Sequence, residues 1–223
     1  MGKQILRHLA CLGLGLAIIG GAFIAPARAA EPDPEKFLGA LAREAIAVLS
    51  DDALDRAGRE DAFRKLLRRG FDLPAVSRFV LGRYWRRANV MEREEFTELF
   101  EDYVVATYGR RLGRYGGDFL KVSGQRADGN NGAIVHSKIG AGKGPVIKVD
   151  WRLTRRAEGW RVVDIMVEGV SLALAQRSEF AAVIRGSGGR VSGLLAKLRK
   201  KTQTLALVSQ PENGQSEPAV SMQ

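Results

Sequence analysis

The sequence predicts an α+β fold in which helices cover a four-stranded antiparallel sheet. Two observations carry this prediction. Apolar residues recur at helical spacing through the first half of the chain, and from Phe119 the pattern changes to the alternation of half-buried strands. The links between the alternating segments are too short for helical crossovers, so neighbouring strands must run antiparallel.

The N-terminus has the features of a secretory signal peptide. Lys3 and Arg7 precede an apolar run over residues 9–24, and Ala27-Arg28-Ala29 forms a small-residue cleavage site. The competing interpretation is a membrane anchor, but the run is short for a span and a processing site follows it. We therefore expect residues 1–29 to be removed. The only cysteine, Cys11, leaves with them, which excludes disulfides, thiol nucleophiles and cysteine metal sites from the remaining domain.

Four helices are expected before the first strand. Asp33-Pro34 places an N-cap before a proline at the first helical position. A second helix covers residues 59–69, and a third runs from Asp72 to Leu81, with Gly82 at its end. Asn89, with Glu92 three residues later, forms a capping box that opens a long helix to about Tyr108.

Four strands follow, separated by turn-rich segments. They are expected at residues 119–126, 133–139, 146–154 and 160–167. Val149, Trp151 and Leu153 alternate along the third strand, as do Val163, Ile165 and Val167 along the fourth, so one apolar sheet face should point toward the helices.

The C-terminal part returns to helix. One helix is expected from Ser171 to Arg185, a break at residues 186–189, and a last helix that ends at residues 199–201. We expect a single domain over residues 30–201. Residues 202–223 are polar with little hydrophobic spacing, and are expected to be a disordered tail.

The charge narrows the class of partner. The chain of 223 residues carries a net charge of +10, which would ordinarily suggest nucleic acid. Export removes that partner and leaves anionic lipid headgroups or acidic protein surfaces. For any single arginine pair, a solvated surface is the competing interpretation.

A nucleophile elbow is the first catalytic possibility. Residues 169–173 approximate G-x-S-x-G at a strand-to-helix junction, which makes Ser171 a candidate nucleophile. Such a hydrolase needs a later histidine and acid, but neither histidine nor aspartate follows Ser171. We interpret Ser171 as a helix N-cap.

The remaining candidates for chemistry are weak. His136 is the only histidine after the signal peptide, so metal or triad chemistry lacks a second imidazole, and a surface or partner-bonded role is expected. Residues 140–145 lack the Ser/Thr and the helix of a phosphate loop, and are interpreted as a hairpin connection. Asp150 and Asp164 could form a pair of carboxylates for acid/base catalysis, but nothing in the sequence sets the distance between them. No catalytic residues, metal site or cofactor are expected.

Two blocks resemble the MlaC/toluene-tolerance family of periplasmic phospholipid-binding proteins. The first is residues 71–108, with FVLGRYW at residues 79–85, and the last is VEGVSLALAQRSEF at residues 167–180. VDWRL at residues 149–153, Gly159-Trp160 and residues 163–165 resemble the family's sheet. The resemblance covers residues 37–198 and implies a twisted sheet with helices that enclose an apolar cavity.

The resemblance also implies a function. Members carry phospholipid between an outer-membrane lipoprotein complex and an inner-membrane ABC transporter, and so maintain the lipid asymmetry of the outer membrane. The hopanoid-associated HpnM branch is an alternative of the same class. A periplasmic adaptor of this fold without a cavity, and a lipid-modifying enzyme that uses Ser171, are the other two classes. Retention of lipid, and the effect of Ser171→Ala on activity, would separate them.

The family function assigns candidate binding residues. The candidates for the lipid pocket are Phe79, Tyr84, Phe96, Phe100, Tyr103, Val104, Val149, Trp151, Val163, Ile165, Val167 and Val170. For each of these, packed core is the competing and commoner role. Arg83, Arg86, Lys148 and Arg177 are candidates for a basic rim that meets the headgroup. A structural pair of Arg177 with Glu168 or Asp164 is the alternative.

Overall fold

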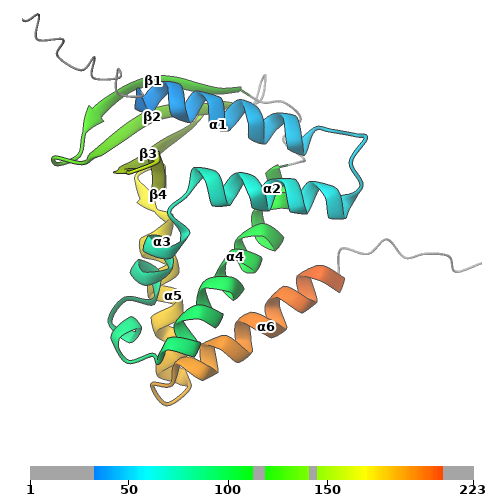
Figure 1. The fold of residues 1–223 in the computed structure, drawn as a ribbon, viewed down its shortest axis with the longest axis vertical. Helices are drawn as coiled ribbons and strands as arrows, with labels where there is room; N and C mark the ends of the chain where they lie inside the picture. Colours follow the sequence, from blue (N-terminus) through cyan, green and yellow to red (C-terminus); the bar gives the residue numbers. More distant parts are fainter. Residues whose placement is uncertain (1–32, 113–118, 141–144, 208–223) are drawn as a thin grey trace, which may run out of the picture. The chain divides into compact units, whose positions relative to one another are not determined.

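The computed structural model describes residues 33–112, 119–140 and 145–207 (Figure 1). The predicted signal peptide and most of the predicted tail lie outside these ranges, as does most of the 140–145 connection. The helices are α1 (Pro34–Leu49), α2 (Arg56–Gly70), α3 (Leu73–Leu81), the 3-10 helix η1 (Gly82–Arg86), α4 (Val90–Leu112), α5 (Leu172–Gly186) and α6 (Val191–Leu207). The strands are β1 (Phe119–Ala127), β2 (Gly132–Gly140), β3 (Ile147–Arg156), β4 (Gly159–Val167) and β5 (Val170–Ser171).

The predicted helix starts are confirmed by side-chain caps. Asp33 accepts a hydrogen bond from the amide of Glu35, and Asp72 accepts one from the amide of Ala75. At α4 the capping box forms in both directions, since Glu92 N donates to Asn89 Oδ1 at 2.9 Å and Asn89 N donates to Glu92 Oε2 at 3.1 Å. The start of α2 was predicted too late, because its N-cap is Asp55.

Within the described ranges the sheet has five strands in the order β1-β2-β3-β4-β5, and every neighbouring pair is antiparallel. The four-stranded meander is confirmed, but the count of four is wrong. After β4 the chain turns through Glu168 and Gly169, both at positive φ (48° and 82°), and pairs Val170 with Val167. Adjacent positive φ values are what a tight two-residue hairpin requires, so the chain adds a short strand before α5.

A β-bulge changes the predicted alternation along β4. Trp151 pairs with Ile165 and Leu153 pairs with Val162, with a register shift between Arg152 and Leu153. Val162 therefore shares the apolar face with Ile165, and Val163 is the extra residue. The expectation that Val163, Ile165 and Val167 share one face is wrong at Val163.

The described core forms three hydrophobic clusters. The first joins α3, η1, α4, α5 and α6 around stacked and edge-on rings of Phe96, Phe100 and Phe180. The second lies between the sheet and α1, which runs along β1 and β2 (Figure 1), and contains Leu38, Val135 and other residues of both layers. The third packs α2 against α4, next to α1.

The last helix is longer than predicted. α6 continues through Leu207, past the expected end at Lys201, so residues 202–207 are helical. The hydroxyl groups of Thr202 and Thr204 donate hydrogen bonds to the carbonyls of Leu198 and Lys200, four residues earlier. These bonds satisfy the two hydroxyls without interrupting the helix. No glycine or proline follows until Pro211.

Candidate functional site

The junction between β4 and α5 is held by Asp164. Its carboxylate is buried and accepts hydrogen bonds from Ser171 Oγ at 2.6 Å, Ala173 N at 3.1 Å and Ile165 N at 2.8 Å. An ionised carboxylate at free amides of a helix N-terminus is stabilised by hydrogen bonds and by the helix dipole. Asp164 therefore fixes the start of α5, a role that its sequence position does not indicate.

Ser171 is confirmed as the N-cap of α5. Its hydroxyl accepts from the amide of Leu174 at 3.0 Å while donating to Asp164. Within the described residues the only imidazole, His136, is bonded to Asp150 and not to Ser171. The hydroxyl is thus engaged on both sides in a structural network.

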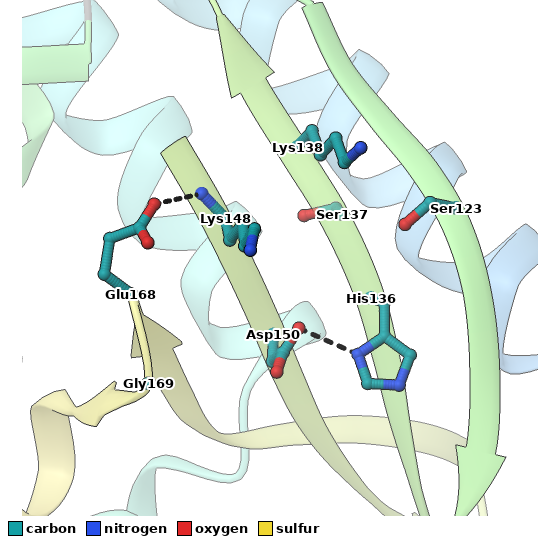
Figure 2. A pocket seen from close by; sticks show the side chains of 8 residues that line it. All are labelled: Ser123, His136, Ser137, Lys138, Lys148, Asp150, Glu168 and Gly169. Carbon is teal, nitrogen blue, oxygen red and sulfur yellow. Dashed lines mark hydrogen bonds and ion pairs between the residues drawn. The ribbon is translucent and has the colours of Figure 1, made fainter. Parts of the chain in front are cut away.

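A polar pocket of about 430 Å³ lies on β1, β2 and β3 and at the turn between β4 and β5 (Figure 2). It is lined by Ser123, His136, Ser137, Lys138, Lys148, Asp150, Glu168 and Gly169. His136 Nδ1 and Asp150 Oδ1 are 2.8 Å apart on neighbouring strands, which confirms the partner-bonded histidine. The carboxylate of Glu168 accepts the backbone amide of Lys148, so it is tied to β3.

Buried hydrogen bonds connect this pocket to the opposite face of the sheet. Ser137, which is buried, donates to the carbonyl of Val149 at 2.8 Å and accepts from Trp151 Nε1 at 2.9 Å. The indole of Trp151 is therefore held across β2 and β3 with its N–H satisfied. No cluster of three or more metal-ligating side chains occurs in the part of the chain that the structure describes.

The helical candidates for the lipid pocket lie mainly in the first cluster. Tyr84, Phe96 and Phe100 are buried there, and Tyr103 and Val104 are packed against it. Phe79 is instead 43% exposed on α3.

The sheet candidates lie elsewhere. Trp151 and Ile165 pack against the second cluster, and Val149 is buried in the same face. Val167 is half-buried opposite Val149, Val163 is half-buried at the bulge, and Val170 is 60% exposed. The structure thus divides the predicted set between a helical cluster and a sheet face.

The four basic candidates for the headgroup rim are also divided. Arg177 lies over the ring of Phe79, 5.2 Å from its centroid, whereas Asp164 and Glu168 bond to other groups. Arg83 lies over the ring of Tyr84 and donates to its hydroxyl at 3.0 Å, and this bond lowers the pKa of Tyr84 below its ordinary value. Arg86 ends η1, while Lys148 lies on β3 at the polar pocket.

Several residues that line the polar pocket were not predicted from the sequence. Ser123, Ser137 and Lys138 line the pocket, and only the predicted strand pairing of residues 133–139 with 146–154 could have brought Lys138 to Lys148. Of the two bulges, the one near Ser123 is marked by Gly124, an isolated glycine inside a strand, whereas the one at Val163 leaves no mark in the residue pattern.

The amino-acid sequence of this chain is similar to those of a known protein family and of two characterised relatives. The MlaC protein family matches residues 40–200. The toluene tolerance protein ttg2D of Pseudomonas putida is 26% identical over 129 residues, which make up 57% of this chain and 60% of that protein. The intermembrane phospholipid transport system binding protein MlaC of Haemophilus influenzae is 22% identical over 135 residues, 59% of this chain and 62% of that one. The chain thus spans about three fifths of the length of these two relatives.

A solved structure has the same fold. It is a phospholipid-binding protein from Ralstonia solanacearum in complex with a phospholipid, with a TM-score of 0.69 and 23% sequence identity. The likeness covers 78% of this chain and 99% of that one. Among the described residues, no helix is both long enough and apolar enough to cross a membrane.

Proposed function

The chain belongs to the MlaC protein family, and on that premise we propose that it is a periplasmic phospholipid carrier. In this proposal it receives and delivers lipid between an outer-membrane lipoprotein complex and an inner-membrane ABC transporter, and so maintains outer-membrane lipid asymmetry. Its role is binding and transport rather than catalysis. Phospholipid as the ligand is supported by the relative named as a phospholipid transport system binding protein and by the similar structure in complex with a phospholipid.

One observation carries the proposal: the apolar face of β3 and β4 is only partly covered. Trp151, Ile165 and Val167 point to one face of the sheet and are all half-buried, although α1 packs on the same face further along. Apolar side chains that keep part of their surface free on the inner face of a sheet offer contact to an acyl chain. We propose that the acyl chains lie along this face.

The energetics suit a carrier without an energy source of its own. Two acyl chains contain roughly 30 methylenes, and at ~0.8 kcal/mol each their removal from water is worth ~24 kcal/mol. This exceeds the ceiling of about 18 to 21 kcal/mol for non-covalent binding, so release into water would be negligible. Transfer to or from a bilayer is close to neutral, because the chains have apolar surroundings in both places.

The test places a charge on the proposed acyl-chain face. Ile165→Lys is compared with Met166→Lys, the next residue, which faces the other side of the sheet opposite Asp150. Both proteins are expressed with export and purified, and their lipid is measured by native mass spectrometry and by extraction. We expect the unmodified protein and Met166→Lys to retain phospholipid and Ile165→Lys to lose it, with similar circular dichroism for all three.

Two results would contradict the proposal. An unmodified protein that is empty and does not exchange lipid with vesicles would favour the adaptor alternative. Equal lipid loss in both variants would remove the apolar face of β3 and β4 as the binding surface. The extracted lipid itself distinguishes phospholipid from hopanoid. Lipid-modifying activity that is present in the unmodified protein and lost in a folded Ser171→Ala protein would favour the enzyme alternative instead.

A further inference from the structure

A row of lysines crosses three neighbouring strands on the sheet face that bears the polar pocket. Lys121 of β1 pairs with Lys138 of β2, and Lys138 pairs with Lys148 of β3. Residues directly opposite in an antiparallel sheet share one face, with Cβ atoms about 5 Å apart. All three lysines, which we call the lysine row, are exposed.

The lysine row has no directly paired carboxylate in the part of the chain that the structure describes. The nearby acids are engaged elsewhere, because Asp150 bonds to His136 and Glu168 accepts the amide of Lys148. Like charges directly opposite in a sheet repel one another, and an anion that bound at this face would relieve that repulsion.

An exposed aliphatic side chain lies at the same end of this face. Val146 is 60% exposed and lies beside Gly140, two residues beyond Lys138, where a Cβ added to the glycine would meet its side chain. Val146 comes directly before Ile147, which forms the last pair of β2 and β3 with Ile139. Because side chains alternate between the two faces of a strand, Val146 lies on the same face as Lys148 and its partner Lys138. The face therefore combines three exposed lysine side chains with an exposed apolar side chain that can insert into the outer part of a bilayer's apolar layer.

We propose that the lysine row and Val146 form a docking surface for the anionic phospholipid headgroups of a bilayer. Lysine is depleted in protein interfaces, where arginine and aromatic anchors dominate, and the lysine row contains neither. Long lysine side chains instead follow a diffuse layer of phosphates and keep their charge hydrated. This surface goes beyond lipid carriage, because it brings the whole protein to a membrane whether or not lipid is bound.

The test is co-sedimentation with vesicles of phosphatidylglycerol and phosphatidylethanolamine, compared with vesicles of phosphatidylcholine alone. We expect the unmodified protein to bind only the anionic vesicles, and to be released by 0.5 M salt, about threefold the physiological ionic strength. Lys121→Glu/Lys138→Glu should bind at least about thirtyfold more weakly, since each lysine near an anionic surface contributes roughly a fivefold factor. Val146→Ser should weaken binding without changing its dependence on salt.

Lys197→Glu/Lys200→Glu is the matched control, with the same change in net charge on exposed positions of α6. It should keep its affinity for anionic vesicles. Equal loss in both double variants would show that net charge alone attracts the protein, and absence of binding by the unmodified protein would equally overturn the docking surface. Lipid extracted from the same preparations separates the two proposals, because a lipid-loaded protein that ignores vesicles contradicts only the docking surface.

Discussion

At the scale of single residues, Asp164 determines how the sheet passes into α5. Its carboxylate contacts β4, the N-cap Ser171 and the first turn of α5 together. The sequence suggested only that Ser171 caps the helix. The buried acid behind the cap could not be inferred, because Asp164 lies seven residues before Ser171 and meets it only through the turn that follows β4.

Replacing Asp164 should therefore cost more than replacing the N-cap itself. Asp164→Ala leaves two amides and one hydroxyl without their acceptor, and should lower the free energy of unfolding by about 3 kcal/mol. Ser171→Ala should cost about 1 kcal/mol, as is usual for an N-cap. Urea denaturation of both single variants and the double variant measures this. The double variant should cost less than the sum, and strict additivity would show that the two side chains do not act together.

At the scale of elements, α2 is fixed to α4 by an apolar contact and a charged one. Phe63, Leu66 and Leu67 pack against Val105, and beside them Arg64 and Arg68 both bond to the buried carboxylate of Glu101. Arg64 also contacts Asp102, whose side chain is much more exposed. The two acids are adjacent on α4 but differ in burial, which makes them a natural comparison.

Loss of the buried acid should destabilise the pair of helices, and loss of the exposed one should not. Glu101→Ala removes the buried acceptor that two arginines share, but Arg68 is 63% exposed and Arg64 keeps Asp102, so the cost should be about 1 to 2 kcal/mol. Asp102→Ala should cost less than about 1 kcal/mol, because exposed ion pairs contribute little. Thermal or urea unfolding of the two variants at the same pH is the measurement. Equal costs would mean that the apolar contact alone joins α2 to α4.

Much of the element order could be predicted from the sequence, because caps and alternation are local signals. Asp33, Asp72 and the Asn89/Glu92 box mark helix starts wherever the rest of the chain lies. The bulges, β5 and the end of α6 could not be predicted in this way. A bulge depends on which partner strand offers its hydrogen bonds, and β5 exists only because Val170 meets the end of β4.

At the scale of the whole molecule, the predicted binding residues show the limit of pattern reading. Phe96 and Ile165 are equally apolar in sequence, yet one is fully buried among helices and the other is half-buried on the sheet. Apolar periodicity identifies the side that turns away from water, but the packing of distant helices decides whether that side meets protein or ligand. For this reason the cavity and its lining stay predictions.

Bound lipid should support the stability of the whole domain. If acyl chains cover the apolar face of β3 and β4, their removal exposes that face to water, and a ligand at a hundredfold its dissociation constant contributes about 2.7 kcal/mol. Delipidated protein should melt about 5 to 10 °C lower than loaded protein, and recover on incubation with phospholipid vesicles. Scanning calorimetry measures this shift. Ile165→Lys should show no difference between the two treatments, and a shift of equal size in that variant would contradict the assigned face.

The outer edge of β4 has a consequence for how the protein behaves at high concentration. β5 pairs with it at Met166 and Val167, and Phe71 forms a bridge to it at Val162 while Asp72 N donates to the Val162 carbonyl. An open strand edge is a template on which a second copy adds its own strand and begins a fibril. Here the chain pairs its own short segments with Val162, Met166 and Val167 of that edge, so a second copy finds a shorter free stretch on which to add a strand.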